Sequence, residues 1–231
     1  MASMKAISSD MNFDFAEAFR ERCPHLKIVY DRFHIVKNFN DKVINEIRKD
    51  EQKRLRKEGD PEVAKKLRRT RYLLTAKKDT LRRRDGEEGW IVRQKSDLFK
   101  PLRWRGKEAG KKRYEDLIKS NQLFFACDVV KESIAEAYRA ETRDGMRQQI
   151  GELSDFCQGT ENKHFRWFSR LLTRHIGIVS FADFRVTNSK LEGINQKIKT
   201  IRRKSYGLPD DEYLFLKLID ATSHCRYLIN F

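Results

Sequence analysis

The sequence predicts an α/β protein that is mostly α-helical. Two short apolar segments near the N-terminus, residues 6–10 and 26–31, flank a stretch whose apolar residues have helical spacing. Residues 35–175 keep a helical spacing throughout, and residues 176–231 add further helical patterns. We therefore expect three parts: a small strand-helix-strand unit over 1–34, a large all-helical insertion over 35–175, and C-terminal helices over 176–231.

The N-terminal unit has the order strand, helix, strand. Apolar residues from Phe13 to Phe19 have helical spacing, and Pro24 separates them from the second strand. A helix between two short strands favours a parallel pair, because the chain must cross over to start the second strand. Asp10 and Asp31 end the two strands. We expect both carboxylates at one edge of the sheet, where ligands commonly bind.

The rest of the chain is predicted to be helical. An amphipathic pattern from Phe33 to about Lys57 predicts a helix of more than five turns, and helical spacing resumes from Tyr114 to His175. Near the end, Thr187 or Asn188 is placed to cap a helix running to about Ser205. A last amphipathic helix is expected from Asp211.

The charge of the chain indicates a polyanionic partner. Lys and Arg number 50 against 34 Asp and Glu, a net charge of +16. Residues 41–120 alone hold 27 cations and 15 acids, so the insertion is the basic part. Nucleic acid is the first candidate; a solvated, generally basic surface is the alternative. The insertion cations expected to contact DNA are Arg82, Arg83, Arg84, Arg103, Arg105, Lys111, Lys112 and Arg113.

Several classes of protein are disfavoured. The four cysteines are scattered without CxxC pairs, so neither a zinc ribbon nor a disulfide framework is indicated. No apolar run approaches the roughly 20 residues that span a bilayer. We therefore expect a cytoplasmic protein that has no membrane partner.

Two motifs carry candidate chemistry. Tyr30-Asp31-Arg32-Phe33-His34 lies at a strand-to-helix junction, and Asn188, Glu192 and Asn195 share one helical face. Two-metal phosphoryl transfer uses carboxylates from separate elements, which Asp10 and Glu192 would supply. The pair alone is weak evidence, because either acid could be a helix cap or a solvated charge.

These motifs resemble DDE transposases of the insertion-sequence family labelled ISL-three. The matching residues are Asp10-Met11, Pro24, Ile28-Val29, Asp31 to His34, and Thr187 to Lys199. The resemblance covers nearly the whole chain and is most specific at its two ends. It implies a partial RNase H-like core, split by the insertion, and DNA transposition by strand cleavage and transfer that depends on Mg²⁺ or Mn²⁺.

The resemblance also implies roles for residues. Asp10 would be the second catalytic carboxylate and Glu192 the third, and both would bind the metal. The accessory residues would be Asp31, His34, Asn188 and Asn195. The cations expected to hold DNA phosphates beside the metal are Lys197, Lys199, Arg202, Arg203 and Lys204. In a competing assignment, Asp10 is the first carboxylate and Asp31 the second.

The family's first carboxylate has no counterpart here. An RNase H-like sheet would hold it in an antiparallel meander, and only five residues precede Ala6. We therefore expect a C-terminal portion of a longer transposase that binds transposon ends and target DNA, is homo-oligomeric when intact, and is inactive alone. The rival hypothesis is a non-catalytic, basic, helical protein that binds nucleic acid.

Overall fold

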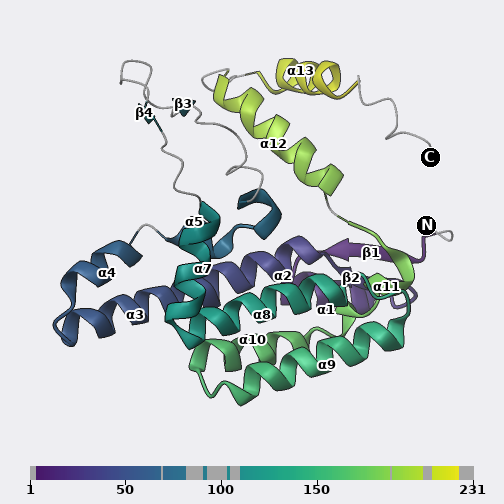
Figure 1. The fold of residues 1–231 in the computed structure, drawn as a ribbon. Coiled ribbons are helices and arrows are strands. Elements are labelled where there is room, and N and C mark those ends of the chain that lie inside the picture. Colours follow the sequence, from purple (N-terminus) through teal and green to yellow (C-terminus); the bar gives the residue numbers. More distant parts are fainter. Residues whose placement is uncertain are drawn as a thin grey trace.

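A computed structural model describes residues 4–68, 70–81, 91–92, 103–104, 110–187, 189–204 and 210–223. Most of these residues are helical, and they include two separate two-stranded sheets. Helices α8, α9 and α10 lie side by side, the N-terminal strands lie at one end of them, and α12 and α13 lie apart from them (Figure 1). The mostly helical character is thus confirmed.

The N-terminal unit has the predicted order: β1 (Ala6–Ser9), α1 (Phe13–Arg22) and β2 (Lys27–Tyr30). The two strands pair in parallel, with Ala6 opposite Lys27. Their C-terminal ends therefore share one edge, as predicted. Within the described residues this sheet has only two strands, so the RNase H-like core remains a prediction.

The long helix predicted after β2 is present, with one irregular turn. Helix α2 (Arg32–Phe39) continues through a π-helical turn, η1 (Asn40–Ile44), into α3 (Asn45–Lys57). The chain then reverses at Gly59, whose φ of 92° suits glycine, and α4 (Pro61–Leu67) follows. The short α5 (Arg71–Thr75) comes next. The sequence predicted the helix but not its π-helical turn.

A helical body supplies most of the core. It consists of α7 (Gly110–Ser120), α8 (Gln122–Ala137), α9 (Arg143–Gly159) and α10 (Lys163–Arg174). Phe39 of α2 packs against Phe168 of α10, with ring centroids 4.8 Å apart, and both side chains are buried. The hydroxyls of Ser154 and Ser169 lie 2.7 Å apart and satisfy each other between α9 and α10.

One part of the insertion is not helical. Strand β3 (Ile91–Val92) pairs antiparallel with β4 (Arg103–Trp104). The prediction of an all-helical insertion over 35–175 is therefore wrong at these positions. β-Branched and aromatic residues such as Ile91, Val92 and Trp104 favour strands, and this local preference was overlooked beside the helical spacing on both sides.

A close approach joins the N-terminal sheet to the body. Gly177 lies in η2 (Ile176–Ile178), and a Cβ atom there would come within 2.7 Å of the Ile28 carbonyl oxygen. The hydroxyl of buried Tyr138, at the end of α8, donates to the Tyr30 carbonyl at 3.1 Å. Both contacts fix β2 against the body.

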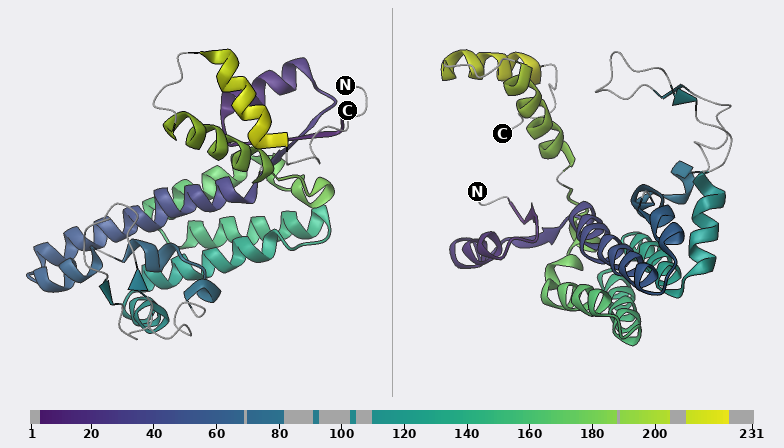
Figure 2. Two further views of the ribbon diagram at one scale, coloured as in Figure 1. Left: turned by 90° about the horizontal axis from the view of Figure 1, so that it is seen from above. Right: turned by 90° about the vertical axis from the view of Figure 1, so that its left-hand side faces the viewer.

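The C-terminal helices follow α11 (Phe181–Phe184). They are α12 (Ser189–Lys204) and α13 (Asp211–Ser223), which contact each other and lie clear of the α8–α10 stack in both views of Figure 2. We call this pair the C-terminal hairpin. Four large apolar side chains of α13 are exposed: Tyr213, Phe215, Leu216 and Ile219. None of the helices in the described part of the chain has the length and apolar character needed to cross a membrane.

Candidate active site

Four of the predicted site residues line one groove. Its volume is about 440 Å³, and Asp10, His34, Asn195 and Lys199 contribute to its walls. Asp10 follows β1, His34 lies in α2, and the other two lie on α12. Residues from the two ends of the sequence are therefore brought to one surface. The remaining lining residues are Ile7, Ser8, Ser9, Phe15, Phe19 and Gln196.

Asp10 presents its carboxylate at the C-terminal end of β1. Its Oδ1 accepts a hydrogen bond from the backbone N–H of Asn12 at 3.2 Å. The Asn12 side chain in turn caps α1 by accepting from the N–H of Asp14 at 3.0 Å. Among the described residues, Asp10 Oδ2 has no hydrogen-bond partner. Asp10 is half-buried, so this oxygen can accept a ligand.

Asp31 is held differently, although it lies at the same edge of the sheet. Its side chain is 6% exposed, and its Oδ1 accepts from the N–H of Phe33 at 3.0 Å, which caps α2. Burial, and next the charge of Asp31, raise the pKa of the Tyr138 hydroxyl. Asp31 is not among the residues that line the groove, whereas His34 is. The two residues share the first turn of α2, where the His34 N–H donates to the Asp31 carbonyl at 3.1 Å, but only His34 lines the groove.

Only part of the second motif, which lies on α12, is found at the groove. Asn195, Gln196 and Lys199 line it. The backbone of Glu192 belongs to α12, one turn before Asn195, and positions three apart share a helical face. The side chain of Glu192 and the whole of Asn188 lie outside the described part of the chain, so the proximity of the Asp10 and Glu192 carboxylates stays a prediction.

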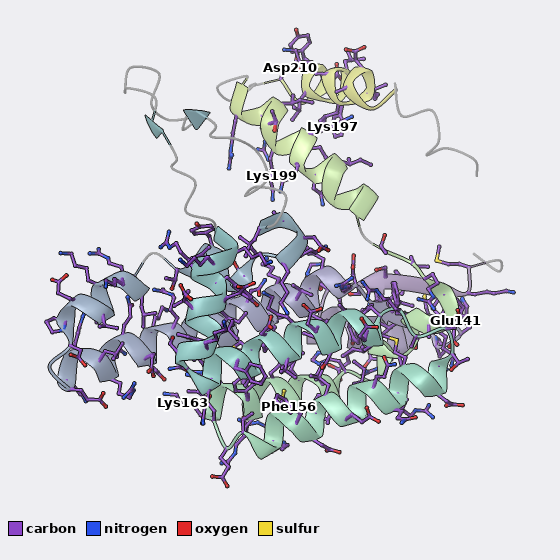
Figure 3. The ribbon with its side chains drawn as sticks, in the orientation of Figure 1. Glu141, Phe156, Lys163, Lys197, Lys199 and Asp210 are labelled. Carbon is purple, nitrogen blue, oxygen red and sulfur yellow. The ribbon has the colours of Figure 1, made fainter. Side chains whose placement is uncertain are left out.

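The predicted DNA-binding cations of α12 have different surroundings. Lys199 faces the groove, whereas Lys197 Nζ donates to the Ala221 carbonyl of α13 at 3.4 Å (Figure 3). Arg202 and Arg203 are exposed. The side chain of Lys204 lies outside the described residues. Lys199 is therefore the cation best placed to pair with a phosphate at the groove.

The insertion cations are only partly described. Arg82, Arg83, Arg84 and Arg105 lie outside the described residues, as does the side chain of Arg103 in β4. At the start of α7, Lys111 pairs with Glu115 at 3.6 Å. The side chains that follow it are exposed: Lys112 and Arg113. Their DNA contacts remain predictions.

Sequence inspection missed an aromatic wall of the groove. Phe15 and Phe19 lie four positions apart on α1, so they share a helical face, and Phe15 is 57% exposed. An i, i+4 aromatic pair immediately after the Asp10 motif was the available signal. The sequence analysis used these residues only as evidence of helical spacing.

The donor set suits a hard divalent cation as far as it is described. Mg²⁺ takes oxygen ligands, and the Asp10 carboxylate and the Asn195 side-chain amide both offer oxygen. Within the described ranges, no three His, Cys, Asp or Glu side chains gather into a metal-binding cluster. Asp10 and Asn195 alone would leave most coordination positions to other oxygens.

Comparison with known proteins places the chain in a family. Residues 1–218 match a family model described as transposase. The chain is also similar to the transposase for insertion sequence element IS1001 of Bordetella parapertussis, with 24% identity over 216 residues. That similarity covers 93% of this chain and 47% of the relative, so the chain spans about half the relative's length. No solved structure matches. Since the matched model covers nearly the whole sequence, this chain belongs to the ISL-three family of transposases.

Proposed function

We propose that this chain supplies two catalytic carboxylates and a DNA-holding surface to an enzyme that cuts and joins DNA during transposition. The observation that carries the proposal is the shared groove, in which Asp10 after β1 meets Asn195 and Lys199 of α12. Glu192 is one helical turn from Asn195 and would add the second carboxylate. DNA, at the transposon ends and at the target, is the proposed substrate in the bacterial nucleoid.

Each residue of the groove would have a distinct task. Asp10 and Glu192 would hold Mg²⁺ or Mn²⁺, which when bound activates the attacking oxygen and stabilises the leaving oxygen at the phosphate. The Asn195 amide would hold a ligand or a phosphate oxygen by hydrogen bonding. Lys199 would pair with a backbone phosphate and so orient the scissile strand. His34 would position a carboxylate or water by hydrogen bonding across the groove.

The number of oxygen ligands bears on the activity of this chain alone. Two carboxylates supply few of the oxygens that a pair of divalent ions requires, about six for each Mg²⁺. We therefore infer that further oxygen ligands, including the first carboxylate that the family resemblance implies, complete the metal site of the intact, homo-oligomeric enzyme. The chain by itself is expected to bind DNA without cutting it.

Nicking of supercoiled plasmid by the intact transposase with Mg²⁺ tests the assignment. Asp10→Asn and Glu192→Gln should each lower the nicking rate by at least about a thousandfold, because each removes a metal-binding charge. Asp31→Asn tests the competing assignment: asparagine is also a good N-cap, so α2 should stay capped, and loss of this accessory carboxylate should lower nicking far less than loss of Asp10. Gel-shift binding of DNA should be nearly unchanged in all three.

Two results would count against the proposal. Nicking at the parental rate by Asp10→Asn would show that Asp10 is not catalytic. If Asp31→Asn also abolished nicking, the catalytic carboxylate would be assigned to Asp31. DNA binding by the intact protein without nicking under any divalent ion would favour the non-catalytic hypothesis.

A further inference from the structure

A helical hairpin projects from the body at the end remote from β1 and β2 (Figure 1). It consists of α3 and α4, joined at Gly59 and extended to Arg68, and we call it the basic arm. The two helices pack along each other and extend beyond α7 and α8 in Figure 1. The groove with Asp10 lies at the other end of the α2–α3 helix. The arm is thus separate from the candidate active site.

The arm is held rigidly by buried polar contacts. Arg48 of α3 is 8% exposed, and its guanidinium donates to the carbonyls of Leu67 at 3.4 Å and Arg68 at 3.3 Å. Gln52 donates to the Ala64 carbonyl at 3.0 Å. These carbonyls lie toward the C-terminal end of α4, where the helix dipole favours a positive charge. The side chains on the arm are therefore presented on a fixed scaffold.

The carboxylates of the arm leave several cations without partners. Residues 45–68 contain nine Lys and Arg against six Asp and Glu. Arg54 binds both Glu51 and Glu58, while Asp50 binds Lys163 and His164 of the body instead of an arm cation. Two further acids are paired within the helices, in Glu46–Lys49 and Glu62–Lys65. Exposed arm cations with no carboxylate among the described residues are Lys53, Arg56, Lys57, Lys66 and Arg68.

Three of these free cations share one face of α3. Lys53, Arg56 and Lys57 have i, i+3, i+4 spacing, which places them on one side of the helix. The opposite side buries Ile47 and Glu51. On α4, a surface hollow of about 350 Å³ is lined by Glu62, Lys65, Lys66 and Arg68. The arm therefore offers a row of cations along α3 and a second cluster on α4.

The neighbouring helices have the opposite charge. Residues 122–159, which include α8 and α9, contain seven Asp and Glu against four Lys and Arg. A groove of about 510 Å³ between α8 and α9 includes Asp128, Glu132, Glu136 and Glu152 in its walls. Such a surface repels a polyanion. Among the described helices, the basic surplus thus lies mainly on the arm, α7, α10 and α12, and is absent from α8 and α9.

We propose that the basic arm is a second DNA-binding site, which holds backbone phosphates of the duplex away from the reacting phosphate. The inference rests on the proposed function, because it takes DNA as the polyanion. Fixed lysines and arginines on an exposed helix face recognise phosphates without regard to sequence. The arm would therefore add affinity and position the duplex, leaving sequence recognition to other parts of the intact protein.

Salt-dependent binding of a fluorescent duplex to this chain tests the arm. In the variant Lys53→Gln, Arg56→Gln, Lys57→Gln, the slope of log affinity against log salt concentration should become shallower by about 2–3, because each lost phosphate contact removes about 0.9. Affinity at low salt should fall by at least about tenfold. A charge-conserving variant, Lys53→Arg, Arg56→Lys, Lys57→Arg, should bind like the parent.

The matched control removes three exposed cations elsewhere: Arg139→Gln, Arg147→Gln, Arg166→Gln. It loses the same charge but should keep the parental slope to within about one unit. Circular dichroism should show that every variant keeps its helix content. Equal effects of the arm and control variants would overturn the proposal, because net charge alone would then explain binding. So would failure of the parent to bind duplex DNA, or weakened binding of RNA but not of duplex DNA in the arm variant.

The two proposals fail in distinguishable ways. If the proposed catalytic role of Asp10 is wrong, Asp10→Asn will nick DNA at the parental rate while the arm variant still binds DNA more weakly. Loss of the arm assignment would appear as unchanged binding in the arm variant, with the nicking results of the groove variants intact.

Discussion

The helical body and the C-terminal hairpin differ in the burial of their large apolar side chains. In the body, Phe165 and Phe168 of α10 are fully buried and meet Phe39 from α2. In the hairpin, Phe215 and Leu216 of α13 are each 63% exposed. The hairpin nevertheless carries the α12 residues that line the groove. The α12 side of the groove thus belongs to a part of the chain whose large apolar side chains are largely exposed, whereas the His34 side belongs to a helix of the core.

This division has a physical basis. A helix packed on several sides contributes buried area, about 25 cal/mol for each Å² removed from water. A helix with one neighbour contributes little but can present side chains to a ligand. The exposed face of α13 also forms an apolar surface of the kind that marks contact sites in other proteins. The hairpin is therefore expected to tolerate substitutions that would unfold the body.

The most direct test compares two phenylalanines. Phe168→Ala should lower the free energy of unfolding by about 3–5 kcal/mol, because it removes a buried ring and leaves a cavity. Phe215→Ala, at an exposed position of α13, should change it by less than about 0.5 kcal/mol. Urea denaturation followed by circular dichroism measures both. If the two substitutions destabilise the chain equally, the hairpin is part of the cooperative core and the division is wrong.

A second test concerns the joint between the sheet and the body. Gly177→Ala should destabilise the fold by about 1–3 kcal/mol, because the new Cβ would lie 2.7 Å from the Ile28 carbonyl oxygen and 2.9 Å from the Tyr30 ring. The control Gly151→Ala, in the middle of α9 with nothing within 4 Å, should stabilise it by about 0.5–1 kcal/mol. Thermal unfolding gives both shifts. If both substitutions stabilised the fold, the backbone at Gly177 could shift to make room for the added Cβ atom, and the close contact would not be a constraint.

The smallest expected effect depends on pH. Hydrogen bonds from Lys163 and then His164 hold the pKa of Asp50 below its usual value, and these contacts fasten α3 to α10. A lowered pKa stabilises the fold above the unfolded-state value, about 3.9, and the contribution disappears as the pH falls through the folded-state value. Because Asp50 is 41% exposed, solvent screening keeps it below about 1 kcal/mol.

Urea denaturation of the parent and of Asp50→Asn at pH 6 and pH 2.5 measures this effect. At pH 6 the parent should have a higher free energy of unfolding than Asp50→Asn. The difference between the two should be smaller at pH 2.5. A difference that is larger at pH 2.5 than at pH 6 would contradict the lowered pKa of Asp50.

Local patterns predicted the elements of this fold well. The crossover between residues 6 and 31 predicted the parallel pair, and the apolar spacing after Phe33 predicted one long helix. Asn162, whose side chain accepts from the N–H of His164 at 2.9 Å, shows how short polar residues set helix starts. Such features depend on neighbours in the sequence, so they can be seen in it.

Features that depend on distant packing were not predictable in the same way. The acids of the arm looked alike in sequence, and only the tertiary structure shows that Asp50 pairs with Lys163 and His164 of α10 and not with an arm cation. Likewise, Asp10 and Asp31 both end strands, but only one of them lines the groove. Family motifs named four residues of the groove, whereas its other lining residues were found only in the tertiary structure.

The π-helical turn η1 connects the two proposed DNA-contacting surfaces through one continuous helix. His34 at the groove precedes this turn, and Lys53 on the arm follows it. Each residue of an α-helix advances the side chains by about 100° around the axis. The π-helical turn closes i→i+5 hydrogen bonds in place of i→i+4 bonds, so it changes the rotation of α3, and with it the arm, about the axis relative to α2. The geometry of this turn therefore sets the direction in which the proposed DNA-binding face of the arm points relative to the groove.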